Sequence, residues 1–345
     1  MHKLFLLLAL LFSCPAVAGK YNAYISQAEL DITNGNFPAA LHDYELAFAT
    51  RTYPFAVDLY HAGLCALKSN NHALAIQYCR RLAAKGVGEQ FFLQSAYAPL
   101  QRDPHWEKLL LEARQQRAEL YRRQGGLICL LDSLVAKDQA VNHDWRAAGM
   151  SSETRRIMDL TYDTIGLHLK RLTDSLGFLS EEQTGAYVEK DTCLRQGRFF
   201  DIIIIHNYTA RMTGDTLFNG TLRRALALEQ IKPEHYASLR DFTHGGDSPD
   251  DYFGTAQLYV QYQCNLYREK LDSSALQQIE QNRKRIDLAP LADYEKKLMY
   301  NIGHRKGIFN IYAPITIYRS FKNESSEQYF LNGHQLIARD IPDCQ

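Results

Sequence analysis

Five polar residues in the second half of the chain could together form a site for acid–base chemistry. His206 follows a run of four isoleucines, and the set is completed by Asp138, Gln139, Arg146 and Asp241. A histidine held by a carboxylate can shuttle protons or bind a metal. A structural alternative stays open, in which His206 is a buried ring satisfied by a neighbouring acid. In that alternative, Asp138, Gln139 and Arg146 form an internal network that fixes the order of the helices.

Other patterns typical of catalysis or metal binding are weak. The sequence lacks G-x-S-x-G, H-E-x-x-H, a P-loop and a dinucleotide fingerprint, so a serine or cysteine nucleophile has no supporting context. Asp247, Asp250 and Asp251 lie beside Gly245-Gly246, and carboxylates on loops can bind calcium. Their spacing differs from that of an EF-hand, and a solvated acidic loop explains them. We therefore expect no metal and no cofactor.

The elements that would position such residues are predicted to be helices. Two stretches near the amino terminus repeat one spacing of small and bulky residues: Gly35, Phe37, Ala40, Tyr44 and Ala47, then Asn70, His72, Ala75, Cys79 and Leu82. Ala40 and Ala75 are thirty-five positions apart, close to the period of about thirty-four residues in a helix–turn–helix repeat. The spacing predicts helical hairpins over residues 21–50 and 56–84.

The first half of the chain resembles a tetratricopeptide-repeat region. Residues 58–113 are similar to a bacterial variant with a helical end-piece, and Asp103-Pro104-His105-Trp106 matches its Asp-Pro-x-Trp step. The resemblance implies stacked hairpins that bind a protein or peptide through a concave face. Residues of the first helix of each pair would line that face: Tyr24, Gln27, Asp31, Tyr60 and Lys68. Two repeats are fewer than the three usually needed, so the end-piece and the second domain would cap the array.

The second half, residues 127–300, resembles an uncharacterised bacterial helical domain of unknown function that is often found with such repeats. The matching positions are Asp138, Gln139, Arg146, Gly177-Phe178, His206, Tyr236, Asp241, Phe253-Gly254-Thr255, Asn282, Arg285, Leu288 or Leu291, and Tyr294. The chain departs from the pattern at polar positions. Asn207 and the residues after it replace an aspartate, Phe242 replaces an arginine, and a glutamine is displaced to Gln257. These losses weaken a catalytic interpretation, and the family implies no agreed activity.

The amino terminus has the pattern of an export signal. His2 and Lys3 precede the apolar run at residues 4–12, and Ala16-Val17-Ala18 offers the small residues that signal peptidase needs. We expect a signal peptide over residues 1–18 and a periplasmic or extracellular protein. The alternative is a membrane-anchored lipoprotein attached through Cys14, although Phe12 stands where a small residue is usual. The apolar run is too short for a transmembrane helix.

The amino-acid composition limits the kinds of partner that the chain is expected to bind. The chain has 345 residues with 39 basic and 39 acidic side chains, so no strong field would recruit nucleic acid. Six cysteines remain without Cys14, an even number that permits disulfides in an exported chain. Cys65 and Cys79 are the first pair to test. Buried free thiols are the alternative for most of the six.

The fold class predicted is mainly α. Tetratricopeptide-like hairpins at residues 19–123 precede a second helical domain at 127–305, and a β-hairpin-like extension occupies 306–345. Four consecutive isoleucines, 202–205, favour a strand by propensity, but no strong partner strand lies nearby, so we expect a buried helix there. In the extension, residues 308–318, 328–333 and 336–338 are expected to form a small β-hairpin, because they alternate, are rich in β-branched and aromatic residues, and include an Asn-Gly step.

The sequence is compatible with three functions. The repeat spacing favours an exported protein that mediates protein or peptide interaction. The alternative is a hydrolase or small-ligand-binding domain around His206 and Asp241, which requires the two side chains to approach within hydrogen-bond reach of a common ligand. The third is a surface component without a small ligand. The sequence does not decide whether the chain is an enzyme.

Overall fold

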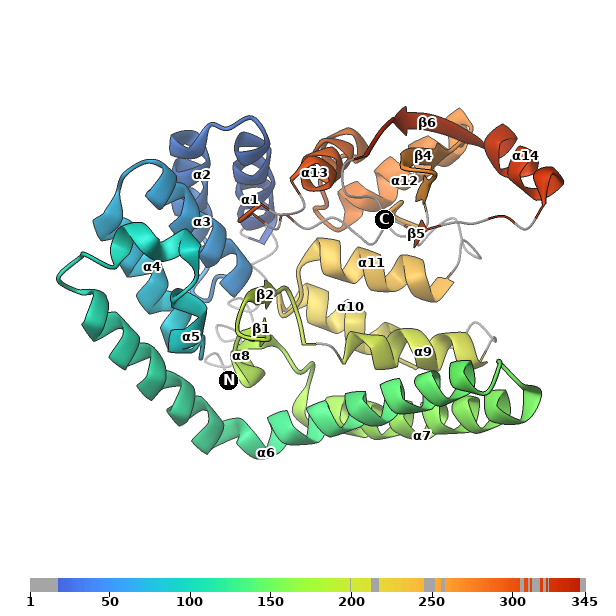
Figure 1. Ribbon diagram of the computed structural model, residues 1–345, viewed down its shortest axis with the longest axis horizontal. Helices are drawn as coiled ribbons and strands as arrows, with labels where there is room; N and C mark the ends of the chain where they lie inside the picture. Colours follow the sequence, from blue (N-terminus) through green and yellow to red (C-terminus); the bar gives the residue numbers. More distant parts are fainter. Residues whose placement is uncertain are drawn as a thin grey trace, which may run out of the picture.

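Figure 1 shows the computed structural model of the chain, which describes residues 18–198, 200–211, 217–244, 252–255, 258–304, 307–309, 311, 317–318, 321 and 323–341. Outside these residues lie nearly all of the expected signal peptide, Cys14, Cys344, Gln257, and the acidic loop with Asp247, Asp250 and Asp251.

Four helices at the amino end form two consecutive hairpins. Helix α1 (Ala18–Thr33) pairs with α2 (Phe37–Ala49), and α3 (Ala56–Lys68) pairs with α4 (His72–Ala84). Asn70, at a φ of 56°, makes the second turn, and the Asn71 side chain caps α4 by accepting a hydrogen bond from Leu74 N. A Cβ atom on Gly63 would lie 3.4 Å from Tyr78 Cβ, so this position of α3 lies in direct contact with α4. The predicted hairpins are confirmed.

Two long helices follow the repeat-like region. After α5 (Glu89–Phe92) and the short 3₁₀ helix η1 (Ser95–Leu100), helix α6 (Trp106–Ala147) runs for 42 residues and turns back into α7 (Ser152–Leu176). The boundary expected between residues 123 and 127 falls inside α6, which continues through Gly125-Gly126 without a break. Ser151 caps α7 by accepting a hydrogen bond from Thr154 N.

The middle of the molecule is built from short elements. They are α8 (Glu181–Thr184), the hairpin of β1 (Tyr187–Glu189) and β2 (Cys193–Arg195), and the helices α9 (Asp201–Arg211), α10 (Asn219–Ala227) and α11 (Pro233–His244). The four isoleucines lie in α9, so the expected helix is confirmed. In Figure 1, α9 to α11 lie between the α6–α7 pair and the carboxyl-terminal sheet.

A small sheet dominates the carboxyl-terminal part. Its strands are β3 (Tyr259–Tyr262), β4 (Asn265–Glu269), β5 (Ile317–Tyr318) and β6 (His334–Ala338), in the order β5-β3-β4-β6, accompanied by α12 (Ser273–Arg285), α13 (Leu291–Gly303) and α14 (Glu324–Gly333). The central hairpin and β6 are antiparallel, while β5 is parallel to β3. Residues 328–333 were expected as a strand and are helical, because Asn323 caps α14 by accepting from Ser326 N. The Asn-Gly step ends this helix before β6.

The mainly α fold class is confirmed, with helical hairpins first and a small, mostly antiparallel sheet that contains the β3–β4 hairpin near the carboxyl end. The first hydrophobic core consists mostly of residues 21–113 but includes Ala186, Leu194, Phe309 and Ile311. A second core contains residues of α6 and α7 together with residues of α9, α10 and α11. A third core packs the sheet against α13. Within the described residues, no helix combines the length and apolarity needed to cross a membrane.

The cysteines correct one expectation. Cys65 and Cys79 are buried free thiols, so they are not a disulfide pair. Burial also raises their pKa values well above the ordinary range of a thiol, which makes them poor nucleophiles. Cys264, in the turn between β3 and β4, is disulfide-bonded.

Candidate functional site

The structure brings together three of the five polar residues of the second half. Asp138 on α6 is fully buried, and its Oδ2 lies 2.8 Å from His206 Nδ1 on α9. Gln139 Nε2 donates to the same oxygen at 2.8 Å. A buried carboxylate that bonds to Nδ1 fixes the orientation of an imidazole ring. Among the described residues, Asp138 Oδ1 has no hydrogen-bond partner.

An aromatic ring completes this centre. Tyr162 on α7 stacks on the His206 ring with centroids 4.6 Å apart and an interplanar angle of 25°. Burial raises the pKa of Tyr162 to about 12, with the Asp138 charge adding to the rise, while the hydrogen bond from Asn142 at 2.9 Å opposes it. Tyr162 is therefore a neutral phenol at physiological pH. The centre contains a carboxylate, an imidazole and a phenol, which are groups suited to proton transfer.

The departure at Asn207 has a structural role. Asn207 is 2% exposed, and its amide nitrogen points towards Tyr162 O at 3.4 Å and Asp163 Oδ1 at 3.5 Å. A Cβ on Gly166 would lie 2.6 Å from Asn207 Cγ, so only glycine fits at this crossing of α7 and α9. Asn207 thus fixes the position of α9, and with it the ring of His206.

Asp241 belongs to a second cluster. It is 1% exposed, its Oδ1 accepts from Phe253 N at 2.8 Å, and its Oδ2 accepts from Thr255 N and Oγ1 at 2.6 and 2.7 Å. Gly254 between them has a φ of 65°, which a glycine adopts without strain. The carboxylate therefore ties residues 253–255 to α11. Arg146 is exposed near the end of α6.

Asn282, Arg283 and Tyr294 support the same segment. Asn282 Nδ2 donates to Tyr252 O at 2.8 Å, Arg283 Nη1 donates to Phe253 O at 2.7 Å, and the Tyr294 hydroxyl donates to Thr255 O at 3.3 Å. The motif positions of the second half thus form two groups, one around His206 and one around Asp241. Their helices, α9 and α11, pack against each other.

The expected binding residues of the repeat-like region differ in accessibility. Gln27 and Lys68 are exposed, Asp31 is half-buried and accepts from Gln27 Nε2 at 3.3 Å, and Tyr24 packs against the first core. Tyr60 donates its hydroxyl hydrogen to Ile308 O at 2.7 Å. The chain's own carboxyl-terminal part therefore already contacts this residue.

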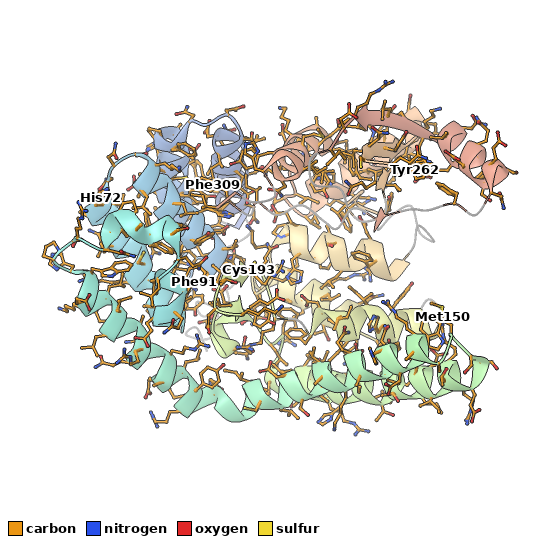
Figure 2. The ribbon with its side chains drawn as sticks, viewed as in Figure 1. His72, Phe91, Met150, Cys193, Tyr262 and Phe309 are labelled. Atoms are coloured by element: carbon orange, nitrogen blue, oxygen red, sulfur yellow. The ribbon has the colours of Figure 1, made fainter. Side chains whose placement is uncertain are left out.

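Phe309 strengthens that internal contact. Its ring stacks on that of Phe37, with centroids 5.5 Å apart and an interplanar angle of 8°. The centroid of the His61 ring lies 6.0 Å from that of Phe309. Figure 2 shows Phe309 among the side chains of the amino-terminal helices. Part of the expected binding face is thus an interface inside the molecule.

A buried charge network joins the same two regions. Lys297 on α13 donates to Glu29 Oε2 at 2.8 Å, and Lys232 donates to Asp58 Oδ1 at 2.8 Å. The Tyr21 hydroxyl also donates to Asp58, at 2.6 Å. Burial alone would raise the pKa of Glu29, but the ammonium groups of Lys297 and Lys232 outweigh it and lower that pKa. The two acids lie in the repeat-like helices, and both lysines come from the second half.

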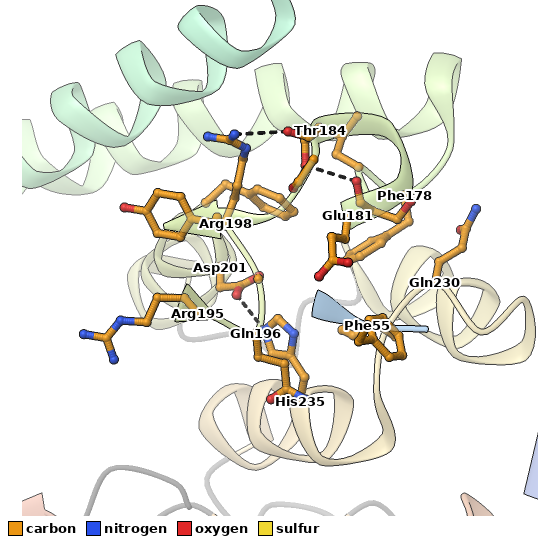
Figure 3. A pocket seen from close by; sticks show the side chains of 17 residues that line it. Phe55, Phe178, Glu181, Thr184, Arg195, Gln196, Arg198, Asp201, Gln230 and His235 are labelled. Atoms are coloured by element: carbon orange, nitrogen blue, oxygen red, sulfur yellow. Dashed lines mark hydrogen bonds and ion pairs between the residues drawn. The ribbon is translucent and has the colours of Figure 1, made fainter. Parts of the chain in front are cut away.

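A further polar interior lies beside α8, and Figure 3 shows it from close by. His235 Nε2 and Asp201 Oδ2 are 2.6 Å apart, across the start of α11 and α9. Glu181 accepts from Ala56 N at 2.9 Å and from Lys85 Nζ at 2.9 Å, so it caps α3 where the local sequence supplies no cap. The cavity itself is about 20 Å³, room for about one water molecule and too small for an organic ligand.

Sequence reasoning missed these charged partners. Lys297 had a detectable signal, because it lies beside the apolar stripe of Leu291, Tyr294 and Leu298 instead of on the polar face. Lys232, Glu181 and the His235–Asp201 pair had none, since each depends on a contact between distant segments. For these residues only the three-dimensional arrangement reveals the role.

Searches of protein family models, curated proteins and solved structures find no match to this chain.

Proposed function

We propose that this chain is an exported, tetratricopeptide-like protein that binds another protein or a peptide. The observation that carries the proposal is the pair of consecutive helical hairpins, α1–α2 and α3–α4, packed through small residues and extended by α5 and α6. Stacked helical hairpins present extended surfaces and typically act as interaction modules.

Two observations support export. The amino-terminal sequence has the basic, apolar and small-residue regions of a signal peptide. Cys264 is disulfide-bonded, and disulfides persist mainly in oxidising compartments outside the cytosol. A signal peptide and a disulfide are both expected of a periplasmic or extracellular protein.

The accessible part of the expected surface defines the experiment. Gln27, Asp31 and Lys68 remain at least partly exposed, whereas Tyr60 is engaged by Ile308. The purified chain would be used to capture partners from an envelope extract, in parallel with Lys68→Ala and Asp31→Ala. Lys108→Ala, on the exposed face of α6, is the control. Loss of a partner with the first two variants and its retention with the control would support the proposal, and equal capture by all four proteins would reject this surface.

A second candidate function is proton-transfer chemistry at His206. It is favoured by one specific observation, the 2.8 Å contact between His206 and the buried Asp138 under the Tyr162 ring. Chromogenic esters, amides and phosphate esters would be tested with the wild type, His206→Gln and the exposed control Arg146→Gln. Turnover that disappears only in His206→Gln supports this function. Absence of turnover, or its persistence in His206→Gln, removes it.

A further inference from the structure

A groove of about 470 Å³ opens where the two halves of the chain meet, within the range of small-molecule sites. It is lined by the start of α1, the loop after α2, the ends of α10 and α12, and the start of α11. Its apolar surface includes Ile231 and Tyr236, each 3% exposed. Three arginines, Arg51, Arg223 and Arg285, reach it from three different segments.

Arg51 is held in a fixed position in this groove. Its side chain is 13% exposed, and its guanidinium lies over the rings of Phe55 at 4.1 Å and Tyr21 at 5.1 Å. Its Nε donates to Tyr53 O at 2.8 Å, and Nη2 donates to Glu229 O. The Nη1 atom forms an ion pair with Glu229 Oε2 at 3.8 Å, a separation longer than a hydrogen bond. A guanidinium that is held in place and lines an open groove is suited to an oxyanion.

Two acidic residues at the rim adopt an unusual backbone conformation. Glu229 and Asp287 both have a φ of 56°, a region that favours glycine or asparagine, and each follows the end of a helix. The N–H groups of Gln230 and Leu288 bond back to the carbonyls of Ala225 and Arg283, so both helix ends are already closed by backbone. The arginines near these ends are therefore not required to satisfy the last carbonyls.

We infer that this groove binds a small organic molecule with one oxyanion, a carboxylate or a phosphate ester, on an apolar body. The charged side chains that line the groove are three guanidinium groups and two carboxylates, a formal excess of cationic groups that favours an anionic ligand. The apolar lining at Leu226, Ala227 and Ile286 accommodates the body. The guanidinium groups of Arg51, Arg223 and Arg285 receive the anion. The site is separate from the surface proposed for a protein partner.

The test uses three probes on the full chain: 4-phenylbutyrate, phenyl phosphate and the neutral 4-phenylbutanamide, titrated by calorimetry. The two anions distinguish a carboxylate from a phosphate ligand. Either anion is expected to bind at least tenfold more tightly than the amide, and its binding should weaken as salt is raised. Arg223→Gln is expected to weaken the anion about tenfold. Arg224→Gln, the next residue along α10, does not line this groove and is the matched control.

A variant that fills the groove provides an independent check. Ala227 is exposed at the end of α10 and lines the groove, so Ala227→Phe should abolish binding without changing any charge or the melting temperature. Equal affinity for the amide and the anions, binding unchanged in Ala227→Phe, equal effects of the two arginine variants, or no binding of either anion would overturn the inference. Capture of a protein partner is measured separately, so failure of one proposal does not decide the other.

Discussion

At the scale of single residues, Asp138 is the group on which the His206 centre depends. It accepts hydrogen bonds from two side chains on different elements while fully buried. Asp138→Ala is expected to lower the free energy of unfolding by about 2 to 3 kcal/mol, since hydrogen bonds to a charged group are lost and their partners are left unsatisfied. Urea titration measures this change. Gln139→Ala, at an exposed position, should change it by about 0.5 kcal/mol or less. Equal effects of the two variants would show that Asp138 is not the anchor.

Asp43 gives a prediction about pH. Burial, and then the neighbouring Asp31 carboxylate, raise the pKa of Asp43 in the folded protein. Because its folded pKa lies above its unfolded value, ionised Asp43 destabilises the fold at neutral pH, and this penalty disappears as the pH falls through the folded pKa. Asp43→Asn should therefore raise the melting temperature at pH 7, with the gain shrinking as the pH is lowered through that pKa. Glu45→Gln on the same helix leaves the carboxyl pair intact and is the control. A gain independent of pH would contradict the assignment.

At the scale of elements, the crossing of α7 and α9 is set by Gly166. A methyl group there would collide with Asn207, so Gly166→Ala is expected to destabilise the protein by about 1 to 3 kcal/mol, the usual cost of overpacking. Gly220 in α10 has nothing within 4 Å of its would-be Cβ, so Gly220→Ala is the control. It should be neutral or stabilising by up to about 1 kcal/mol, because alanine favours helix. The two variants are compared by thermal melting. A stabilising Gly166→Ala would mean that the helices separate without cost.

How far the elements could be predicted depends on whether their signals are local. The hairpins α1–α2 and α3–α4 have their apolar spacing and turn residues within thirty positions, and α9 could be recognised because no strand partner stood nearby. The segment 328–333 was predicted wrongly, since the Asn-Gly step suits a hairpin turn as well as a helix end, and the cap at Asn323 decides between them. The β1–β2 hairpin carries too few alternating residues to stand out.

The same distinction applies to the candidate site. The family-like positions pointed to Asp138, Gln139 and His206, which do meet, whereas Asp241 turned out to hold residues 253–255. Arg51 and Glu181 were not foreseen, because their partners lie 178 and 125 residues away in the sequence. Contacts of such separation leave no spacing pattern in a single sequence.

At the scale of the whole molecule, the buried pair of Glu29 and Lys297 makes the repeat-like helices and the carboxyl-terminal half one cooperative structure. Lys297→Met removes one partner of a fully buried ion pair and is expected to cost about 3 kcal/mol, somewhat moderated because Lys232 stays 3.8 Å from Glu29. Hydrogen exchange followed by mass spectrometry should then show faster exchange in both α1 and α13, while α7 is unaffected. Lys296→Met changes the exposed neighbour and should leave hydrogen exchange in all three helices unchanged.

If exchange rose in α13 alone, the two halves would be separately folding domains, and the groove between them would lose its fixed geometry. Faster exchange in α1 as well means that the halves fold together, because a contact 268 residues apart in sequence then controls the stability of the first helix.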